Sequence, residues 1–486
     1  MSEVIVRFPP SPTGVLHIGT VRTCLYNYLF AKKQNGKIIL RMEDTDVERS
    51  KKEYAENIMS GLTRLGISWD EGPIYQSQRT AFYKKHLQKL LAEEKAYYCF
   101  CTPEELAAER AEQEAKKLPP RYSGRCRHLS PADAEKRVRN GEKAVIRFRV
   151  PENRGDIVFT DLVRGEVHIH TKEIADFVIA KHLDTPLYNF VVVVDDHDMR
   201  ISHVIRGEDH ISNTPKQILL YEAFGFDVPQ FAHLPLILNA DKSKLSKRKN
   251  NVSVDDYLAD GILPEALINY LALLGWNTAD EQEIFSLPEL IEKFSLHRVQ
   301  KGGAIFDMER LLWMNGVHIR KKSVKEIKEL VWEFLKENNI FVQGRKRYGE
   351  EFYEKAVSLV HERLKKLSEA PDCMRFFFIP EEDFTLTADM FPHKKMKVDI
   401  PGAKKALELA MRTLEEVVEN DWNEAHLETI LLSLAKKNEM KNGQLLWPIR
   451  VALSGEKFSP GVFELLAIFG KERSLARIKK GISVLN

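Results

Sequence analysis

The stretch EVIVRFPPSPTGVLHIGTVRTCLYNYLFAKKQNGKIILRM, residues 3–42, decides the fold class of this chain. Residues 3–8 are rich in β-branched side chains, and a loop containing proline and glycine follows them. From Ile18, apolar residues recur at the i, i+3, i+4 spacing of a helix that buries one face. Residues 37–42 predict a second strand. Strand, loop, helix and strand in this order open a parallel α/β sheet.

The sheet is predicted to resume far along the chain. Strand character returns at residues 191–196 (VVVVDD), 201–209 (ISHVIRGED) and 231–239 (FAHLPLILN). Residues 96–185 have a different texture, with cysteines, a Glu/Lys/Ala-rich helix at 103–117 and extended runs. They therefore indicate an insertion within the sheet.

The last third of the chain predicts helices. Ser323 is a suitable helix cap, and amphipathic runs such as 324–338 and 403–419 follow it. A boundary is therefore expected at residue 323.

Length and composition limit the class of protein. A chain of 486 residues needs more than one core, and 43% hydrophobic with 30% charged residues is typical of globular proteins. The N-terminus shows no signal-peptide pattern, and no apolar run is long enough to span a bilayer. We therefore expect a cytoplasmic protein that does not associate with membranes.

The first candidate site lies between the first strand and the first helix, in PTGVLHIGT (residues 12–20). Backbone N–H groups at a helix start suit phosphate, and Gly14 and Gly19 allow a close approach. His17 adds a donor for charge that develops on phosphorus. The alternative is a helix start with a capping histidine.

The second candidate site is KLSKR (residues 244–248), in a lysine-rich loop after an apolar strand. Such a run is often only a solvated face. A loop of lysines can also close over a triphosphate and neutralise the pyrophosphate that leaves.

Together, the HIGT and KLSKR segments resemble the nucleotide-binding pair of class I aminoacyl-tRNA synthetases. Further segments resemble the bacterial-type glutamyl-tRNA synthetases, and the similarity runs nearly end to end. These segments are RFPPSPTG (7–14), LRMEDTD (40–46), VDDH (194–197), VIRGEDH (204–210) and LPEALINYL (263–271).

The resemblance implies a set of site residues. The glutamate pocket would comprise Arg7, Ser11, Glu43, Tyr188 and Arg206. ATP would be bound by His17, Gly19, Asp209, Lys244, Leu245, Ser246, Lys247 and Arg248, and catalysis would depend on His17, Gly19, Thr20 and Lys247.

The chemistry of these residues agrees with glutamate as the substrate. Arginine forks can pair with its two carboxylates, and Glu43 can meet its ammonium group. Which of Arg7 and Arg206 takes which carboxylate stays open, and an ordinary ion pair between Arg206 and Glu43 is the alternative. Val192 stands where some members of the family have asparagine, so a polar contact there is in doubt.

The third candidate site combines Cys99, Cys101, Cys126 and His128. Two pairs of soft ligands can close a tetrahedral metal site, so one structural Zn²⁺ per chain is expected. The alternative is a group of buried cysteines beside a surface histidine.

The resemblance also implies the reaction and the domains. Glutamate would be activated by ATP with Mg²⁺ and transferred to the 3′-terminal ribose of tRNA(Glu), by a monomer; tRNA(Gln) stays open as a second substrate. The expected domains are a Rossmann-like catalytic domain in two halves (1–95 and 186–240), an inserted α+β acceptor-binding domain with the zinc site (96–185), a stem-contact region with the KLSKR loop (241–322) and all-α anticodon-binding domains (323–486).

Basic and aromatic side chains suited to RNA occur in two regions. The insertion offers Arg121, Tyr122, Arg125, Arg127 and Arg147, and the tail offers Trp447, Arg450, Lys471, Arg473, Arg477, Lys479 and Lys480. By sequence alone, the tail could equally be a solvated basic helix. One rival function is a tRNA-binding paralogue without activity. It would have a damaged ATP site, whereas His17, Gly19 and Lys247 are present here. Another is a zinc hydrolase, which would need a metal site with an open ligand position.

Overall fold

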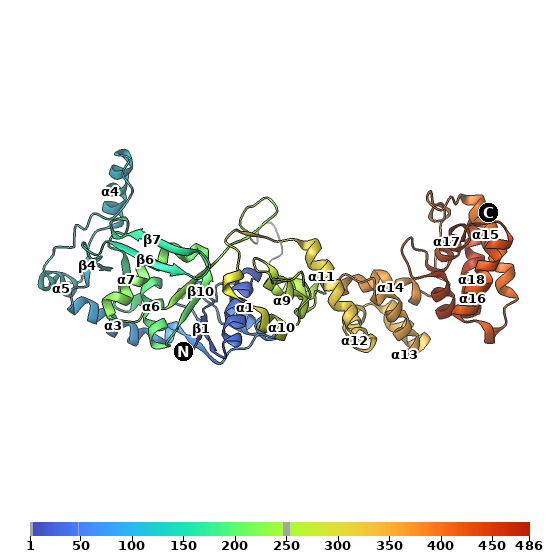
Figure 1. Cartoon of the computed structure of the whole chain (residues 1–486), viewed down its shortest axis with the longest axis horizontal. Helices are drawn as coiled ribbons and strands as arrows, with labels where there is room; N and C mark the ends of the chain where they lie inside the picture. The colour runs from blue at the N-terminus through green and yellow to red at the C-terminus, as the bar shows by residue number, and fades with distance from the viewer. Residues whose placement is uncertain (1–2, 47, 246–252) are drawn as a thin grey trace. The chain divides into compact units, whose positions relative to one another are not determined.

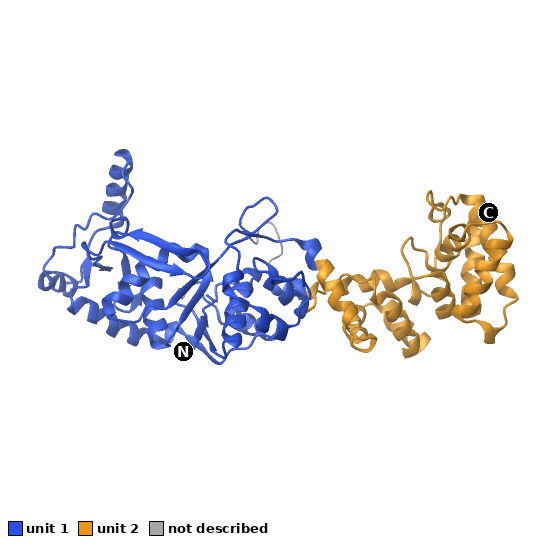
Figure 2. Ribbon diagram, in the orientation of Figure 1, with its two compact units in different colours: residues 1–258, 264–311 blue, residues 259–263, 312–486 orange. Residues whose placement is uncertain are grey.

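The computed structural model describes residues 3–46, 48–245 and 253–486. The chain forms two compact units (Figure 2). The first comprises residues 1–258 and 264–311, and the second comprises 259–263 and 312–486. The main division therefore falls at 311/312, and the sequence-based boundary was placed at 323.

The N-terminal sheet has the predicted form. Strands β1 (Ile5–Phe8), β2 (Lys37–Met42) and β3 (Glu71–Tyr75) are parallel and lie in the order β1-β2-β3. Helix α1 (Ile18–Lys33) joins β1 to β2 and packs against both strands (Figure 1). The strands predicted at 3–8 and 37–42, and the helix predicted from residue 18, are thus confirmed. Helix α2 (Lys52–Arg64) leads to β3.

A second sheet carries the other half of the fold. Strands β10 (His203–Gly207) and β11 (Gln230–Leu234) are parallel, and β6 (Asp156–Asp161) and β7 (Gly165–His170) extend them in the order β10-β11-β6-β7. The strand predicted at 231–239 is divided into β11 and the short β12 (Ile237–Leu238).

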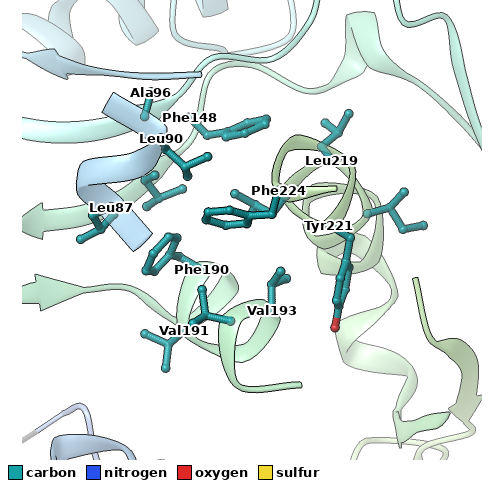
Figure 3. Close-up of a cluster of buried hydrophobic side chains, with 14 of the residues drawn as sticks. Leu87, Leu90, Ala96, Phe148, Phe190, Val191, Val193, Leu219, Tyr221 and Phe224 are labelled. Atoms are coloured by element: carbon teal, nitrogen blue, oxygen red, sulfur yellow. The ribbon is translucent and has the colours of Figure 1, made fainter. Parts of the chain in front are cut away.

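The prediction of a strand at residues 191–196 is wrong, because this segment lies in helix α6 (Tyr188–Asp198). Phe190 to Val194 are buried on every side of the helix, so the segment shows no amphipathic period that would distinguish it from a buried strand. Helices α3 (Thr80–Ala92) and α7 (Thr214–Phe224) pack against α6. Figure 3 shows Val193 and its neighbours in this core. Tertiary burial thus outweighs the preference of valine for strands.

The segment 96–185 contributes strands to two different sheets. Strands β4 (Ala96–Cys99), β5 (Val145–Phe148), β8 (Val178–His182) and β9 (Thr185–Pro186) form an antiparallel sheet in that order. Helices α4 (Pro103–Ala115) and α5 (Pro131–Arg139) lie between β4 and β5. The helix predicted at 103–117 is confirmed, and a capping box of Thr102 and Glu105 starts it. Strands β6 and β7 come from the same range of the chain but belong to the β10–β11 sheet.

Short elements complete the first unit and lead into the second. They are α8 (Val254–Ala259), α9 (Pro264–Leu273), α10 (Leu287–Lys293), β13 (Ala304–Ile305) and α11 (Met308–Lys321). Helices α9 and α10 pack against α1.

The second unit is helical, as predicted. Ser323 caps α12 (Val324–Leu335) in a capping box with Glu326. The later helices are α13 (Asn339–His361), α14 (Ala370–Phe378), α15 (Ile400–Glu415), α16 (Glu424–Lys437), α17 (Asn442–Ser454) and α18 (Val462–Val484). In the part of the chain that the structure describes, no helix has the length and apolar character needed to span a membrane.

Several arginines that sequence analysis offered to RNA are occupied within the fold. Arg477 is fully buried and pairs with Glu381, which also pairs with Arg473. In the insertion, Arg147 is buried, and Arg127 pairs with the Asp176 carboxylate. These four candidate side chains are therefore engaged in contacts within the fold.

Candidate active site

The candidate active site is a cavity of about 520 Å³ where the β1-β2-β3 sheet adjoins the β10-β11-β6-β7 sheet. Strands β1 and β10 adjoin there, and Ser202 Oγ accepts the Ile5 backbone N–H at 2.8 Å. Ligands of open α/β sheets bind outside the carboxyl ends of the strands. Arg7 near the end of β1 and Arg206 near the end of β10 therefore line the same cavity.

The cavity brings together most of the residues predicted from the sequence. Its described lining includes Arg7, Ser11, His17, Gly19, Thr20, Glu43, Tyr188, Arg206, Asp209, Lys244 and Leu245. Ser246, Lys247 and Arg248 lie outside the described residues. The described chain on either side of them reaches the site, because Lys244 lines the cavity and Ser253 forms a β-bridge with His17.

One side of the cavity is built by the start of helix α1. His17 is the N-cap of this helix, and its Nδ1 accepts the Gly19 backbone N–H at 3.0 Å. The proton of a neutral ring is then carried by Nε2. The first turn of α1 contains no acidic side chain. It can therefore receive an anion such as phosphate. The capping role and a phosphate-binding role of His17 are thus compatible.

Two buried guanidinium groups also line the cavity. Arg7 is 1% exposed and Arg206 is 5% exposed. Arg7 Nε donates to Asp196 at 3.3 Å, and Arg206 Nη2 donates to Thr214 Oγ1 at 2.7 Å. For each arginine, Nη1 is buried and has no hydrogen-bond partner among the described residues. A buried, charged donor left unpaired is costly, and both residues line the cavity, so an anion bound there could supply the missing acceptors.

Glu43 lies in a network of charges. Arg41 Nη2 is 3.3 Å from Glu43 Oε1, and Arg41 Nη1 is 2.7 Å from Asp196 Oδ1. Burial raises the pKa of Glu43, although Arg41 and Arg7 attract its charged form. The alternative of an ordinary ion pair between Arg206 and Glu43 is wrong, because the partner of Glu43 is Arg41.

Tyr188 is the first residue of α6 and lines the cavity. Its hydroxyl lies 3.0 Å from His210 Nδ1, and His210 also lines the cavity. Burial and the nearby Arg206 lower the pKa of His210 to about 4, so its ring is neutral. Val192 is 1% exposed in α6 and is not among the described lining residues.

Sequence analysis missed the residues that support the two arginines. Arg41 and Asp196 belong to segments already singled out, 40–46 and 194–197, so a local signal existed for them. Thr214 and His233 accept hydrogen bonds from Arg206, and no sequence motif contained either residue.

The candidate metal site contains three of its four predicted ligands. The sulfur atoms of Cys99, Cys101 and Cys126 lie within 4.8 Å of one another, and two of them are 3.6 Å apart. Tetrahedral thiolates on zinc are about 3.8 Å apart, so the group fits the ion. His128 is exposed and is not part of this group. The hydroxyl of Tyr122 lies there instead, 3.4 Å from Cys99 Sγ and 3.8 Å from Cys101 Sγ.

Comparison with known families agrees with this geometry. Residues 3–313 match the family of class I tRNA synthetases for E and Q, catalytic domain, and residues 316–482 match an anticodon binding domain. The model of the catalytic domain thus covers both sheets and the cavity.

Individual relatives match over the whole chain. Glutamate–tRNA ligase 2 of Thermoanaerobacter pseudethanolicus is 45% identical over 100% of this chain and 99% of its own. Glutamate–tRNA ligase of Aquifex aeolicus is 45% identical over 100% of both chains. A crystal structure of a glutamate tRNA ligase from Elizabethkingia meningosepticum, in complex with its amino acid, superposes with a TM-score of 0.87 at 34% identity over 100% of both chains. This chain therefore belongs to the glutamate–tRNA ligase family of class I tRNA synthetases.

Proposed function

We propose that the cavity between β1 and β10 carries out both steps by which glutamate is joined to tRNA. A carboxylate oxygen of L-glutamate attacks the α-phosphorus of ATP, the bond from that phosphorus to the bridging oxygen breaks, and pyrophosphate leaves. A hydroxyl of the 3′-terminal ribose of tRNA then attacks the acyl carbon of glutamyl-adenylate and loses its proton, and AMP leaves.

The paired, unsatisfied arginines carry this proposal. Arg7 Nη1 and Arg206 Nη1 are the buried donors that a dicarboxylate would satisfy, one at each end. Glu43 would accept the ammonium group, and Ser11 and Tyr188 would complete the pocket. A substrate with one carboxylate, such as glutamine, would leave one guanidinium unpaired, and this cost favours glutamate.

ATP would bind at the start of α1. Backbone N–H groups near Gly19, with His17 and Thr20, would face the α-phosphate, where negative charge builds in the transition state. Asp209, Lys244, Leu245, Ser246, Lys247 and Arg248 would complete the nucleotide site. Mg²⁺ would accompany the triphosphate, because phosphate oxygens are the ligands that it prefers.

We further propose one structural Zn²⁺ per chain, held by Cys99, Cys101 and Cys126. The fourth ligand predicted from the sequence is His128, and Tyr122 is a competitor because its hydroxyl already lies beside two of the sulfurs. Zinc content measured for the His128→Ala and Tyr122→Phe variants would separate these two assignments. A zinc content far below one per chain in the unmodified protein would reject the site.

The remaining assignments follow from the family. The second unit would bind the anticodon of tRNA(Glu), the insertion at 96–185 would contact the acceptor end, and residues 241–322 would contact the stem. We infer a cytoplasmic monomer with no membrane partner.

Charging assays with radiolabelled glutamate test the proposal. The full-length protein is expected to form glutamyl-tRNA from ATP, glutamate and tRNA(Glu), and Lys247→Ala is expected to lose most of this activity. Separate reactions with tRNA(Gln) decide whether the enzyme also charges that tRNA. Charging of glutamine, or full activity in the Lys247→Ala variant, would contradict the proposal.

A further inference from the structure

Asp161 and His233 form a buried pair behind the wall of the cavity. Asp161 ends β6, His233 lies on the neighbouring strand β11, and both side chains are 0% exposed. His233 Nδ1 is 2.6 Å from Asp161 Oδ2. Asp161 Oδ1 accepts the backbone N–H groups of Val163 and Arg164 at 2.9 and 2.8 Å. Neither member of the pair is among the described residues that line the cavity, so neither contacts a substrate there directly.

The other ring nitrogen of His233 faces Arg206. Arg206 Nε lies 3.1 Å from His233 Nε2. A guanidinium group only donates, so Nε2 must accept, and the proton of the ring lies on Nδ1 and points at Asp161. Burial lowers the pKa of His233, which favours this neutral ring. Burial also opposes the charge of Asp161, but hydrogen bonds from His233 and the backbone outweigh it and lower its pKa.

This arrangement orients the guanidinium group of Arg206. Nε is held by His233, and Nη2 is held by Thr214 Oγ1 at 2.7 Å. The group also lies 5.7 Å from the centre of the Phe231 ring. Two of its three nitrogens are thus anchored, and the third, Nη1, is buried without a partner among the described residues, in a side chain that lines the cavity.

Arg7 and Arg206 are anchored by groups of different charge. Arg7 Nε contacts the Asp196 carboxylate directly, whereas Arg206 Nε contacts the neutral ring of His233. Asp196 also attracts the charge of Arg206, but no hydrogen bond joins them among the described residues. Coulomb energy falls as distance grows, so the charge of Arg206 is offset less within the protein. The guanidinium group of Arg206 is thus fixed in position, and its positive charge is largely uncompensated until an anionic ligand binds.

We propose that Asp161 and His233 are positioning residues for glutamate recognition. The carboxylate of Asp161 sets the tautomer of His233, and His233 in turn fixes Arg206 with Nη1 directed at one carboxylate of the substrate. This inference rests on the proposed function of the cavity and adds a pair outside the pocket to the residues on which glutamate binding depends.

Asp161→Asn tests the tautomer. The asparagine amide that faces His233 would donate to Nδ1, so the ring proton would move to Nε2 and oppose the Arg206 N–H. We expect KM for glutamate to rise about tenfold to a hundredfold, as for a lost hydrogen bond to a charged group. KM for ATP should be unchanged, because His17 and the start of α1 are untouched.

His233→Gln and His233→Asn form a matched pair. Glutamine can place its amide oxygen where Nε2 lies and accept from Arg206 Nε, whereas asparagine is one carbon too short. His233→Gln is therefore expected to recover most of the loss in glutamate KM that His233→Asn shows. Thr214→Val, which removes the second anchor with little change of shape, should raise KM for glutamate in the same direction.

A double-mutant cycle with Arg206→Lys separates positioning from general damage. If His233 acts through Arg206, His233→Asn should add little to the loss caused by Arg206→Lys. Thermal denaturation of each full-length variant, with and without glutamate, reports folding and binding independently of catalysis. Additive effects, or an equal rise in KM for ATP and for glutamate, would overturn the inference. Failure of the unmodified protein to charge tRNA with glutamate would instead overturn the proposed function.

Discussion

Arg206 in the first unit and Arg477 in the second are both buried, but their hydrogen bonds differ. Arg477 donates from Nε and Nη2 to Glu381, from Nη1 to the Leu453 carbonyl and from Nη2 to the Phe376 carbonyl. All three of its nitrogens are satisfied. Arg206 lines a cavity, and its buried Nη1 has no partner in the described part of the chain. A satisfied buried arginine holds a fold together, whereas an unsatisfied one at a cavity indicates a ligand.

Arg206→Gln should produce the largest change. It removes the charge that meets a substrate carboxylate, so kcat/KM for glutamate is expected to fall about a thousandfold, as when a buried charge loses its partner. The fold should tolerate the change, because a buried charge with an unpaired donor is also removed. Charging kinetics and Tm measure the two effects. A fall in kcat/KM of less than tenfold would contradict the reading of Arg206 as a ligand-binding group.

Arg477→Met should reverse this pattern. Glu381 and two buried carbonyls would lose their donors, so Tm is expected to fall by about 5 °C, which corresponds to roughly 2 kcal/mol in a unit of this size. KM for glutamate should not change. Glu381→Gln, which keeps an acceptor for Arg477 and removes the charge, is the matched control and should cost less. If Arg477→Met lost glutamate binding but kept its Tm, the comparison between the two arginines would fail.

The sequence predicted those parts of the fold whose periodicity is visible locally. From Ile18, apolar side chains recur at the i, i+3, i+4 spacing over a length too great for a strand, and residues 37–42 are short and contain β-branched side chains, so both elements could be assigned from the sequence. Helix α6 could not, because Phe190 to Val194 are buried all round and a buried helix then looks like a buried strand. Its packing partners include α3, which lies far away in the sequence, and α7, which follows it.

The candidate site divides in the same way. Arg7, His17, Glu43 and Arg206 belong to segments that resemble a family, so sequence placed them in one site. Asp161 and His233 meet only because β6 and β11 are neighbours in a sheet, and 72 residues separate them in the chain. Nothing in a single sequence states which strands adjoin, so the residues behind the pocket needed the structure.

Glu43 is a carboxylate in the same cavity as Arg206. We expect its protonation to weaken glutamate binding less than the loss of Arg206 does. Burial raises its pKa, so it takes up a proton at higher pH than an ordinary glutamate. The protonated form cannot pair with the ammonium group of the substrate. KM for glutamate should therefore rise as pH falls through this raised pKa, by about tenfold per pH unit below it.

The pH dependence of kcat/KM for glutamate measures this effect. Glu43→Gln should show a high KM at every pH and lose the acid limb. Retention of the limb in that variant would assign the titration to another group.

Lys244 and Asp209 form a solvent-exposed ion pair, in contrast to the buried arginines, and we expect its loss to have the smallest effect. Their side chains are 61% and 48% exposed, and Lys244 Nζ lies 3.3 Å from Asp209 Oδ2. Water and salt screen such a pair, so its loss should leave Tm unchanged. Lys244→Met is expected to raise KM for ATP only about two- to fivefold, because a solvated ammonium gains little by moving from a carboxylate to a phosphate. The rise should shrink at high salt, which KM measurements at two ionic strengths would test. A rise in KM for ATP of a hundredfold or more would mean that Lys244 becomes desolvated when ATP binds. The exposed fraction of a charged side chain in the unliganded protein would then be a poor guide to its contribution to binding.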